Sequence, residues 1–236
     1  MTTTGGLAVT LLVMVAVNIW VHVGPRPAQL VTGPVAAAAV LLVARGSGLS
    51  WTQLGLGRQT LAAGARYAAV AAGAVGVAYG IGVLVPATRT AFRDTRYQLP
   101  ASSALRIAVV AVPLGTVVFE EVAFRGVLWG LVDQDLGARW ATAVSSVLFG
   151  LWHVLPALDL ARTSTALRAR GPRRLLPTVL GTVAFTTGAG VVFGGLRELS
   201  GSLLAPAGLH WATNGLGVLA SALVWAVSRR SPPVPS

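Results

Sequence analysis

The stretch IAVVAVPLGTVVFEEVAFRGVLWGLV, residues 107–132, decides the fold of this chain. A helix needs ~20 mostly apolar residues to cross a hydrocarbon layer of ~30 Å, so the apolar run before the two acids is too short to cross alone. The stretch spans a membrane only if Glu120, Glu121 and Arg125 lie inside it. At ~1.5 Å per residue, Glu120 then lies near the midplane. Because an ionisable group there costs at least ~2.5–3.5 kcal/mol on insertion scales, we expect Glu120 to face a protein interior or a water-filled cavity.

The composition agrees with a membrane protein. Hydrophobic residues make up 54% of the 236 residues and charged residues 11%, which lies outside the balance of an average soluble domain. The formal charge of +11 would suggest nucleic acid in a soluble protein, but the arginines lie between apolar runs and are better explained as loop charges. We therefore expect membrane lipid as a partner and no nucleic acid. The chain has no Cys, which excludes disulfides and thiolate metal sites.

We predict an all-α fold, a polytopic transmembrane helical bundle of about seven spans. Breaks rich in Gly, Pro and Arg separate the apolar runs, and the second run has the weakest signal. We expect a single membrane domain over residues 1–230, with a disordered tail over residues 231–236. The predicted spans are Leu7–Val23, Pro27–Ala44, Tyr67–Val85, Ile107–Val132, Trp140–Leu158, Leu175–Leu196 and Leu203–Val227.

Two of these spans are dense in glycine, which predicts close helix packing through small residues. The glycines lie in the third and sixth spans; they are Gly73, Gly76, Gly80 and Gly82, then Gly181, Gly188, Gly190, Gly194 and Gly195.

The distribution of arginine between loops predicts the orientation in the membrane. Twelve arginines fall in the first, third and fifth loops and the C-terminal tail, whereas five fall in the loops on the opposite side. The positive-inside rule therefore places the C-terminus in the cytoplasm and, with seven spans, the N-terminus outside. We expect a multi-pass protein of the cell membrane. An error of one span would reverse the orientation of the N-terminal half.

Helical spacing separates the roles of the two adjacent acids. Residues four apart share a helical face, whereas neighbours are turned by about 100°. Glu121 can therefore pair with Arg125, and a buried pair of this kind could serve helix packing alone. Glu120 points elsewhere and has no local counter-ion, which makes it the carboxylate suited to act as a general base.

Two of the three histidines lie inside predicted spans. His153 is in the fifth span and His210 in the seventh. Each has a partner four residues away on its own face, Phe149 for His153 and Asn214 for His210. A carboxylate and an imidazole can activate water, and neutral donors can hold the oxyanion that forms when an amide is attacked. These groups therefore suit hydrolysis without a serine or cysteine nucleophile.

In this part of the chain, three motifs resemble those of the CAAX-protease and bacteriocin-processing family, the Rce-type glutamate-dependent intramembrane endopeptidases. They occur in the order and with the spacing of the family, over about residues 107–227. The motifs are EExxxR in Glu120-Glu121-Val-Ala-Phe-Arg125, FxxxH in Phe149-Gly-Leu-Trp-His153, and HxxxN in His210-Trp-Ala-Thr-Asn214.

The resemblance implies an intramembrane endopeptidase, a hydrolase that cleaves a peptide bond of a membrane-associated protein or peptide substrate. It implies that Glu120 and His153 activate the attacking water. His210 and Asn214 would then stabilise the oxyanion.

The same resemblance implies roles for three further residues. Glu121 and Arg125 would orient the water-activating group, in agreement with their helical spacing, and Phe149 would shape the wall of the pocket.

Metal dependence has two readings. Glu120, His153 and His210 could supply three ligands of an open zinc site. Against zinc, no two histidines share a helix at i and i+4, as they do in the HExxH arrangement. We expect no cofactor, with zinc as the alternative.

Two other functions compete with hydrolysis. The chain could be a non-catalytic membrane binding or bacteriocin-immunity protein that keeps the site as a structural relic. It could also be a proton-coupled transporter that uses Glu120 and His153 as a relay, although no internal repeat is visible. The short, Arg-only chain looks bacterial, so a prenylated substrate is not the expected target, and the sequence leaves the substrate and the oligomeric state open.

Overall fold

The protein folds into a bundle of helices. The structure, a computed structural model, describes residues 1–25, 28–163 and 175–230. Of these described residues, 88% are helical, and none lies in a β-strand. The predicted all-α polytopic bundle is therefore confirmed. The tail over residues 231–236 and most of the arginine-rich fifth loop lie outside the described residues.

The first half of the chain forms three long helices and a compact connection. The elements in this half are α1 (Thr3–Val23), α2 (Gln29–Gly46), the 3-10 turn η2 (Arg58–Thr60), α3 (Leu61–Leu84), α4 (Pro86–Arg89), and the 3-10 turns η3 (Thr90–Phe92) and η4 (Thr95–Tyr97).

The second half alternates between α-helical and π-helical geometry. It begins with α5 (Ala101–Arg106), η5 (Ile107–Ala111), η6 (Pro113–Val117), α6 (Val118–Glu120), η7 (Glu121–Leu128) and α7 (Trp129–Leu136), which together form one continuous helical rod. It continues through α8 (Ala138–Trp152), α9 (Val154–Thr163), α11 (Leu175–Ser200), α12 (Leu204–Trp211), η9 (Ala212–Leu216) and α13 (Gly217–Arg230).

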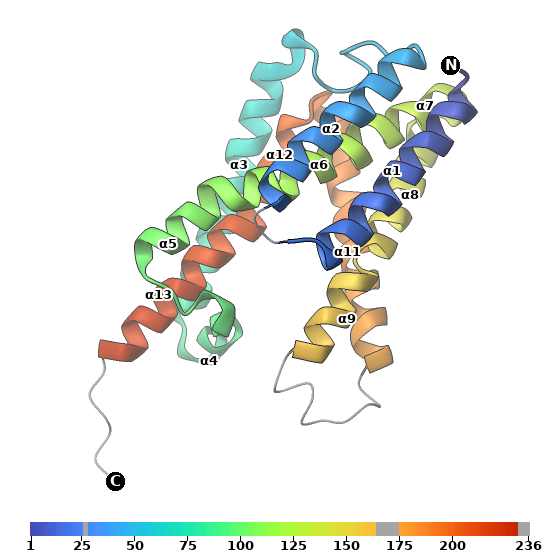
Figure 1. Ribbon diagram of the computed structural model, residues 1–236. Coiled ribbons are helices and arrows are strands. Elements are labelled where there is room, and N and C mark those ends of the chain that lie inside the picture. The colour runs from blue at the N-terminus through green and yellow to red at the C-terminus, as the bar shows by residue number, and fades with distance from the viewer. Residues whose placement is uncertain (26–27, 164–174, 231–236) are drawn as a thin grey trace.

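Within the part of the chain that the structure describes, six helical rods are long and apolar enough to cross a membrane, and α2 is a shorter apolar helix. The predicted count of seven spans is thus approximately right, with the second run as the short member. An internal proline, Pro34, interrupts the hydrogen-bond ladder of α2. In Figure 1 the start of α1 and the end of α13 lie at opposite ends of the bundle. These features describe a multi-pass membrane protein.

The rod over residues 101–136 lies at the centre of the bundle. It packs against α1, α2, α8 and α12, and its large apolar side chains, such as Phe124 and Leu128, join the main core cluster. Three of its segments, η5, η6 and η7, are π-helical. Pro113 has no N–H to donate to the preceding turn, which loosens the ladder there. Because π-helical turns frequently occur at functional sites, this geometry favours a functional role for the acids at the start of η7.

The glycine-rich helices pack closely on only part of their surface. A Cβ on Gly190 would lie 2.9 Å from Ser146 Cα, and one on Gly194 would lie 2.7 Å from Thr142 Cγ2, so α11 approaches α8 through these two positions. The prediction of close packing is wrong for five of the other glycines, because no described atom lies within 4 Å of a Cβ placed there. These are Gly73, Gly80, Gly181, Gly188 and Gly195.

Candidate active site

The two adjacent acids lie inside the bundle and point in different directions. Glu120 ends α6 and Glu121 begins η7. Glu120 is 7% exposed and faces a cavity, whereas Glu121 is 2% exposed and lies among polar groups of the interior. The turn of about 100° between neighbouring helical residues accounts for this divergence.

Glu121 connects two helices through one carboxylate oxygen. Its Oε1 accepts a hydrogen bond from Arg125 Nη1 at 3.3 Å and lies 2.7 Å from His210 Nδ1. An ionised carboxylate only accepts, so Nδ1 of His210 carries the proton of this short contact. The pairing with Arg125 predicted from the i, i+4 spacing is present. The contact with His210 joins residues 89 positions apart and could not be found by spacing within one helix.

Arg125 is fully buried, with an exposed fraction of 0%. Its guanidinium lies 4.0 Å from the ring centre of Phe149 and 4.7 Å from that of Phe193. Aromatic faces attract a cation, and this attraction is stronger where water is excluded. The rings and the Glu121 carboxylate together compensate a charge that hydrocarbon alone could not hold.

Glu120 keeps one oxygen free. Its Oε1 accepts a hydrogen bond from Trp152 Nε1 at 3.1 Å. Its Oε2 is buried and has no hydrogen-bond partner among the described residues, and the nearest imidazole nitrogen, His210 Nε2, is 3.8 Å away. That distance exceeds a hydrogen bond. Glu120 therefore lines the cavity with one carboxylate oxygen bonded and the other without a hydrogen bond.

His153 caps the C-terminal end of α8, where the last turn has the tighter i to i−3 hydrogen bond. Its backbone N–H bonds to Gly150 O at 3.1 Å instead of to Phe149 O, which leaves the Phe149 carbonyl to face His153 Nδ1 at 2.8 Å. A carbonyl can only accept, so Nδ1 is the protonated nitrogen and Nε2 of the neutral ring is free to accept a proton. His153 also lines the cavity that Glu120 faces.

His210 and Asn214 come from the helix that closes the bundle. His210 is buried and stacks on Phe193, with ring centres 5.2 Å apart. Asn214 is one turn further along, in η9, and its side chain is exposed to the same cavity as Glu120 and His153. His210 is the more buried of the two, and both residues line a second cavity.

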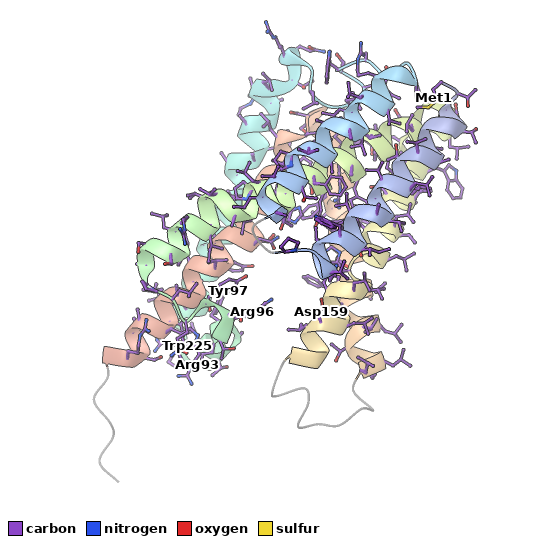
Figure 2. All side chains as sticks on the ribbon, in the orientation of Figure 1. Met1, Arg93, Arg96, Tyr97, Asp159 and Trp225 are labelled. Carbon is purple, nitrogen blue, oxygen red and sulfur yellow. The ribbon has the colours of Figure 1, made fainter. Side chains whose placement is uncertain are left out.

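Two cavities meet at these residues. The first, of about 770 Å³, extends from Glu120, His153 and Asn214 to the segment that carries Asp94 and Arg96. Figure 2 labels Arg96 at the end of the molecule remote from Met1.

The second cavity, of about 630 Å³, is bounded by α11 and shares His153 and Asn214 with the first. Phe149 lies in its wall. Small and apolar side chains of α11, including Ala184, Ala189 and Val192, form most of the opposite side.

At the rim of the first cavity, a short segment is tied to α13. The backbone carbonyl of Asp94 accepts hydrogen bonds from Ser221 Oγ at 3.2 Å and Trp225 Nε1 at 3.0 Å. Its carboxylate pairs with Arg96, with Nη2 and Oδ2 2.6 Å apart. The hydrogen bond from Arg96 lowers the pKa of Asp94 below its ordinary value.

The described residues do not form a metal site. No three His, Asp or Glu side chains among them are grouped so that they could hold an ion. Glu120, His153 and His210 therefore do not fit the zinc alternative as a ligand set, and no chemical step is assigned to a metal. Independence from metal stays a prediction.

The family comparison matches the part of the chain that carries all of these residues except the cavity rim. A family model for the type II CAAX prenyl endopeptidase Rce1-like family covers residues 102–216. Residues 102–216 are similar to this Rce1-like family. The resemblance inferred from the three motifs is thereby confirmed by a match to a CAAX-protease family. No curated protein and no solved structure matches the chain.

The sequence patterns did not identify two polar residues of this site. Trp152 bonds Glu120 through its indole, and Asn18 Nδ2 of α1 donates to the Trp152 backbone carbonyl at 3.0 Å. Trp152 stood inside the FxxxH motif as an unspecified position. The signal for Asn18 was an amide inside an apolar span, which is costly unless it has a partner.

Proposed function

We propose that this chain is an intramembrane endopeptidase that hydrolyses a peptide bond of a membrane-associated protein or peptide with water activated by Glu120 and His153. The observation that carries the proposal is the free, buried Oε2 of Glu120 on a cavity that His153 and Asn214 also line. A buried carboxylate on the same cavity as an imidazole is a suitable acceptor for the proton of water.

The reaction follows from the hydrogen-bonding capacity of each group. Water in the cavity gives a proton to Glu120 Oε2, and its oxygen attacks the substrate carbonyl carbon. Asn214 donates an amide N–H to the oxyanion that forms. The proton then passes to the leaving amine, with His153 Nε2 in reach of the same cavity, and the C–N bond breaks. Two peptide fragments, a carboxylate and an amine, are the products.

His210 can join the oxyanion contact only in one protonation state. Its Nδ1 proton already points to Glu121 at 2.7 Å, so Nε2 donates only when the ring is a doubly protonated imidazolium. Glu121 holds the Nδ1 side of the His210 ring, and Arg125 holds Glu121 in place from the other side. The EExxxR motif thus supports both the base and the oxyanion contact.

We expect the substrate to bind as an extended segment. A helical segment bonds its own carbonyls and would not offer one to Asn214. The first cavity extends to the Arg96 segment, at the end of the bundle where α13 also ends (Figure 1). We infer that this end faces the cytoplasm, since the loops there carry most of the arginines. Apolar substrate groups would lie in the second cavity, against α11.

The test compares membranes that carry the wild-type protein or Glu120→Gln. We expect a substrate fragment that forms with the wild type and, in a detergent assay on that substrate, a kcat about 10²–10⁴ lower for Glu120→Gln. Glu198→Gln is the matched control, because Glu198 is exposed near the end of α11. A chelator such as EDTA should leave the wild-type rate unchanged.

Equal cleavage by the wild type and Glu120→Gln would refute Glu120 as the base. The absence of any fragment, together with an unchanged cellular phenotype for Glu120→Ala, would favour a non-catalytic binding or immunity protein.

A further inference from the structure

Trp152 links the candidate base to a helix outside the family match. We propose that Trp152 is a positioning residue whose indole N–H fixes the Glu120 carboxylate, so that Oε1 is held and Oε2 is presented to the cavity. This inference rests on the proposed function of Glu120. It assigns a role to a position that the FxxxH motif leaves unspecified.

The first support is the geometry of the carboxylate. Glu120 Oε1 accepts from Trp152 Nε1 at 3.1 Å, and Oε2 has no partner among the described residues. A glutamate side chain rotates about several bonds, and without a fixed donor it would sample orientations in which neither oxygen meets the substrate. One hydrogen bond at Oε1 therefore determines where the other oxygen points.

The second support is that the Trp152 ring is itself immobilised. Its ring centre lies 5.6 Å from that of Phe124 in an edge-to-face contact and 5.8 Å from that of Phe119. Both phenylalanines are buried in the rod that carries Glu120. The donor and its acceptor are thus held by the same aromatic cluster, which satisfies the requirement that a positioning group be more rigid than the group it positions.

The third support is a brace on the Trp152 backbone. In a continuous helix the carbonyl of Trp152 would accept from the N–H of residue 156, but residue 156 is Pro and has no N–H. Asn18 of α1 supplies the missing donor, with Nδ2 3.0 Å from Trp152 O. Asn18 is buried in an apolar span, where an amide without a partner would be costly. The side chain of Asn18 therefore holds α8 at the turn that presents both Trp152 and His153.

The fourth support is a contrast with other tryptophans of the described residues. Trp129 gives its indole N–H to Thr142 Oγ1 at 3.0 Å, and Trp211 and Trp225 give theirs to backbone carbonyls. Among these four indoles, Trp152 is the one that donates to a carboxylate. Hydrogen bonds to charged groups are about twice as strong as neutral ones. Trp129 is consequently a matched control for the loss of a buried indole donor.

The kinetic test replaces the donor and keeps an aromatic ring. Trp152→Phe should lower kcat by about 10- to 100-fold with KM nearly unchanged, because the lost bond acts on the base and not on substrate binding. Trp129→Phe should leave kcat within about threefold. Added to Glu120→Gln, Trp152→Phe should cause no further loss, since residues that act as a unit are not additive. Equal kcat values for the two tryptophan variants, or full additivity with Glu120→Gln, would overturn the inference.

A spectroscopic test needs no substrate. In detergent micelles, the indole ¹⁵N–¹H resonance of Trp152 should shift when Glu120→Leu removes the acceptor, while that of Trp129 stays in place. An unmoved Trp152 resonance would refute the hydrogen bond even if the enzyme cleaves its substrate. A shifted resonance in a protein without proteolytic activity would instead reject the proposed function and leave the contact established.

Discussion

Two helical rods of almost equal hydropathy have very different surroundings. The rod Arg58–Leu84, which contains α3, has only 6% of its most apolar window buried, whereas the rod Ala101–Leu136 has 39% buried. The second rod carries Glu120, Glu121 and Arg125 at mid-length, and α3 has no ionisable side chain in its central turns except that of Tyr79. Hydropathy therefore indicates that a helix crosses the membrane, and the polar residues indicate which helix the others enclose.

The enclosure has a physical cause. A charge at mid-membrane must be paired and shielded from lipid, and α1, α2, α8 and α12 supply that cover around the second rod. The rod Arg58–Leu84 has no charge at mid-length that must be covered. Its large side chains, such as Val70, Val77 and Leu84, are exposed on the surface of the bundle. Comparing substitutions on the two rods and on the loop between them tests this account.

The largest difference is expected from the buried charge. Arg125→Met should lower the free energy of unfolding by about 3–5 kcal/mol, because it leaves the Glu121 charge without its buried partner. Arg96→Met, at a pair on the loop between the two rods, should cost less than about 1 kcal/mol. Unfolding of both variants in detergent measures the difference.

A double variant serves as the control for Arg125. Glu121→Gln together with Arg125→Met removes both charges and should recover part of the lost stability. If Arg125→Met were no more damaging than Arg96→Met, the enclosed rod would not be the stable centre described above.

A smaller difference is expected from adding one methyl group to each rod. A Cβ on Gly130 would lie 2.4 Å from Cδ2 of Leu49, a fully buried side chain that would have to shift, so Gly130→Ala should cost about 1–3 kcal/mol. Gly80→Ala on α3 meets no described atom within 4 Å and should be neutral or stabilising by up to about 1 kcal/mol through helix propensity. Melting curves in the same detergent compare the two, and similar losses would contradict the difference in enclosure.

The smallest effect is expected from the loop between the rods, through pH. The hydrogen bond from Arg96 lowers the pKa of Asp94 in the folded protein below its ordinary value of 3.8. Its stabilising contribution is therefore complete above the unfolded value and is lost as the pH falls through the lowered folded value. Because the pair is partly exposed, the change should stay under about 1 kcal/mol.

Asp94→Asn should lack this acid-dependent increment, as measured by melting temperature against pH in the acid range. A wild type and an Asp94→Asn variant with parallel profiles would show that the pair contributes nothing to stability.

The sequence predicted the features that are set within a single helix and did not predict the contacts between two helices. A helix over residues 107–132 long and apolar enough to cross a membrane and the Glu121–Arg125 pair followed from length and i, i+4 spacing, and both are present. The contacts of Glu121 with His210 and of Glu120 with Trp152 join different helices, so no single period encodes them. The glycines of α11 illustrate the same limit, because Gly188 and Gly190 look equivalent in sequence and only Gly190 meets a neighbour.

The bond between Asn18 and Trp152 also has a consequence for how the protein is made. Translation proceeds from the N-terminus, so α1 is available in the bilayer before α8 is synthesised. The carbonyl of Trp152 has no N–H donor within its helix, because residue 156 is Pro. It can thus bond to Asn18 of α1 as soon as α8 forms. Glu120, synthesised between the two, acquires its tryptophan neighbour late, which would delay the appearance of hydrolytic capacity until most of the bundle has been translated.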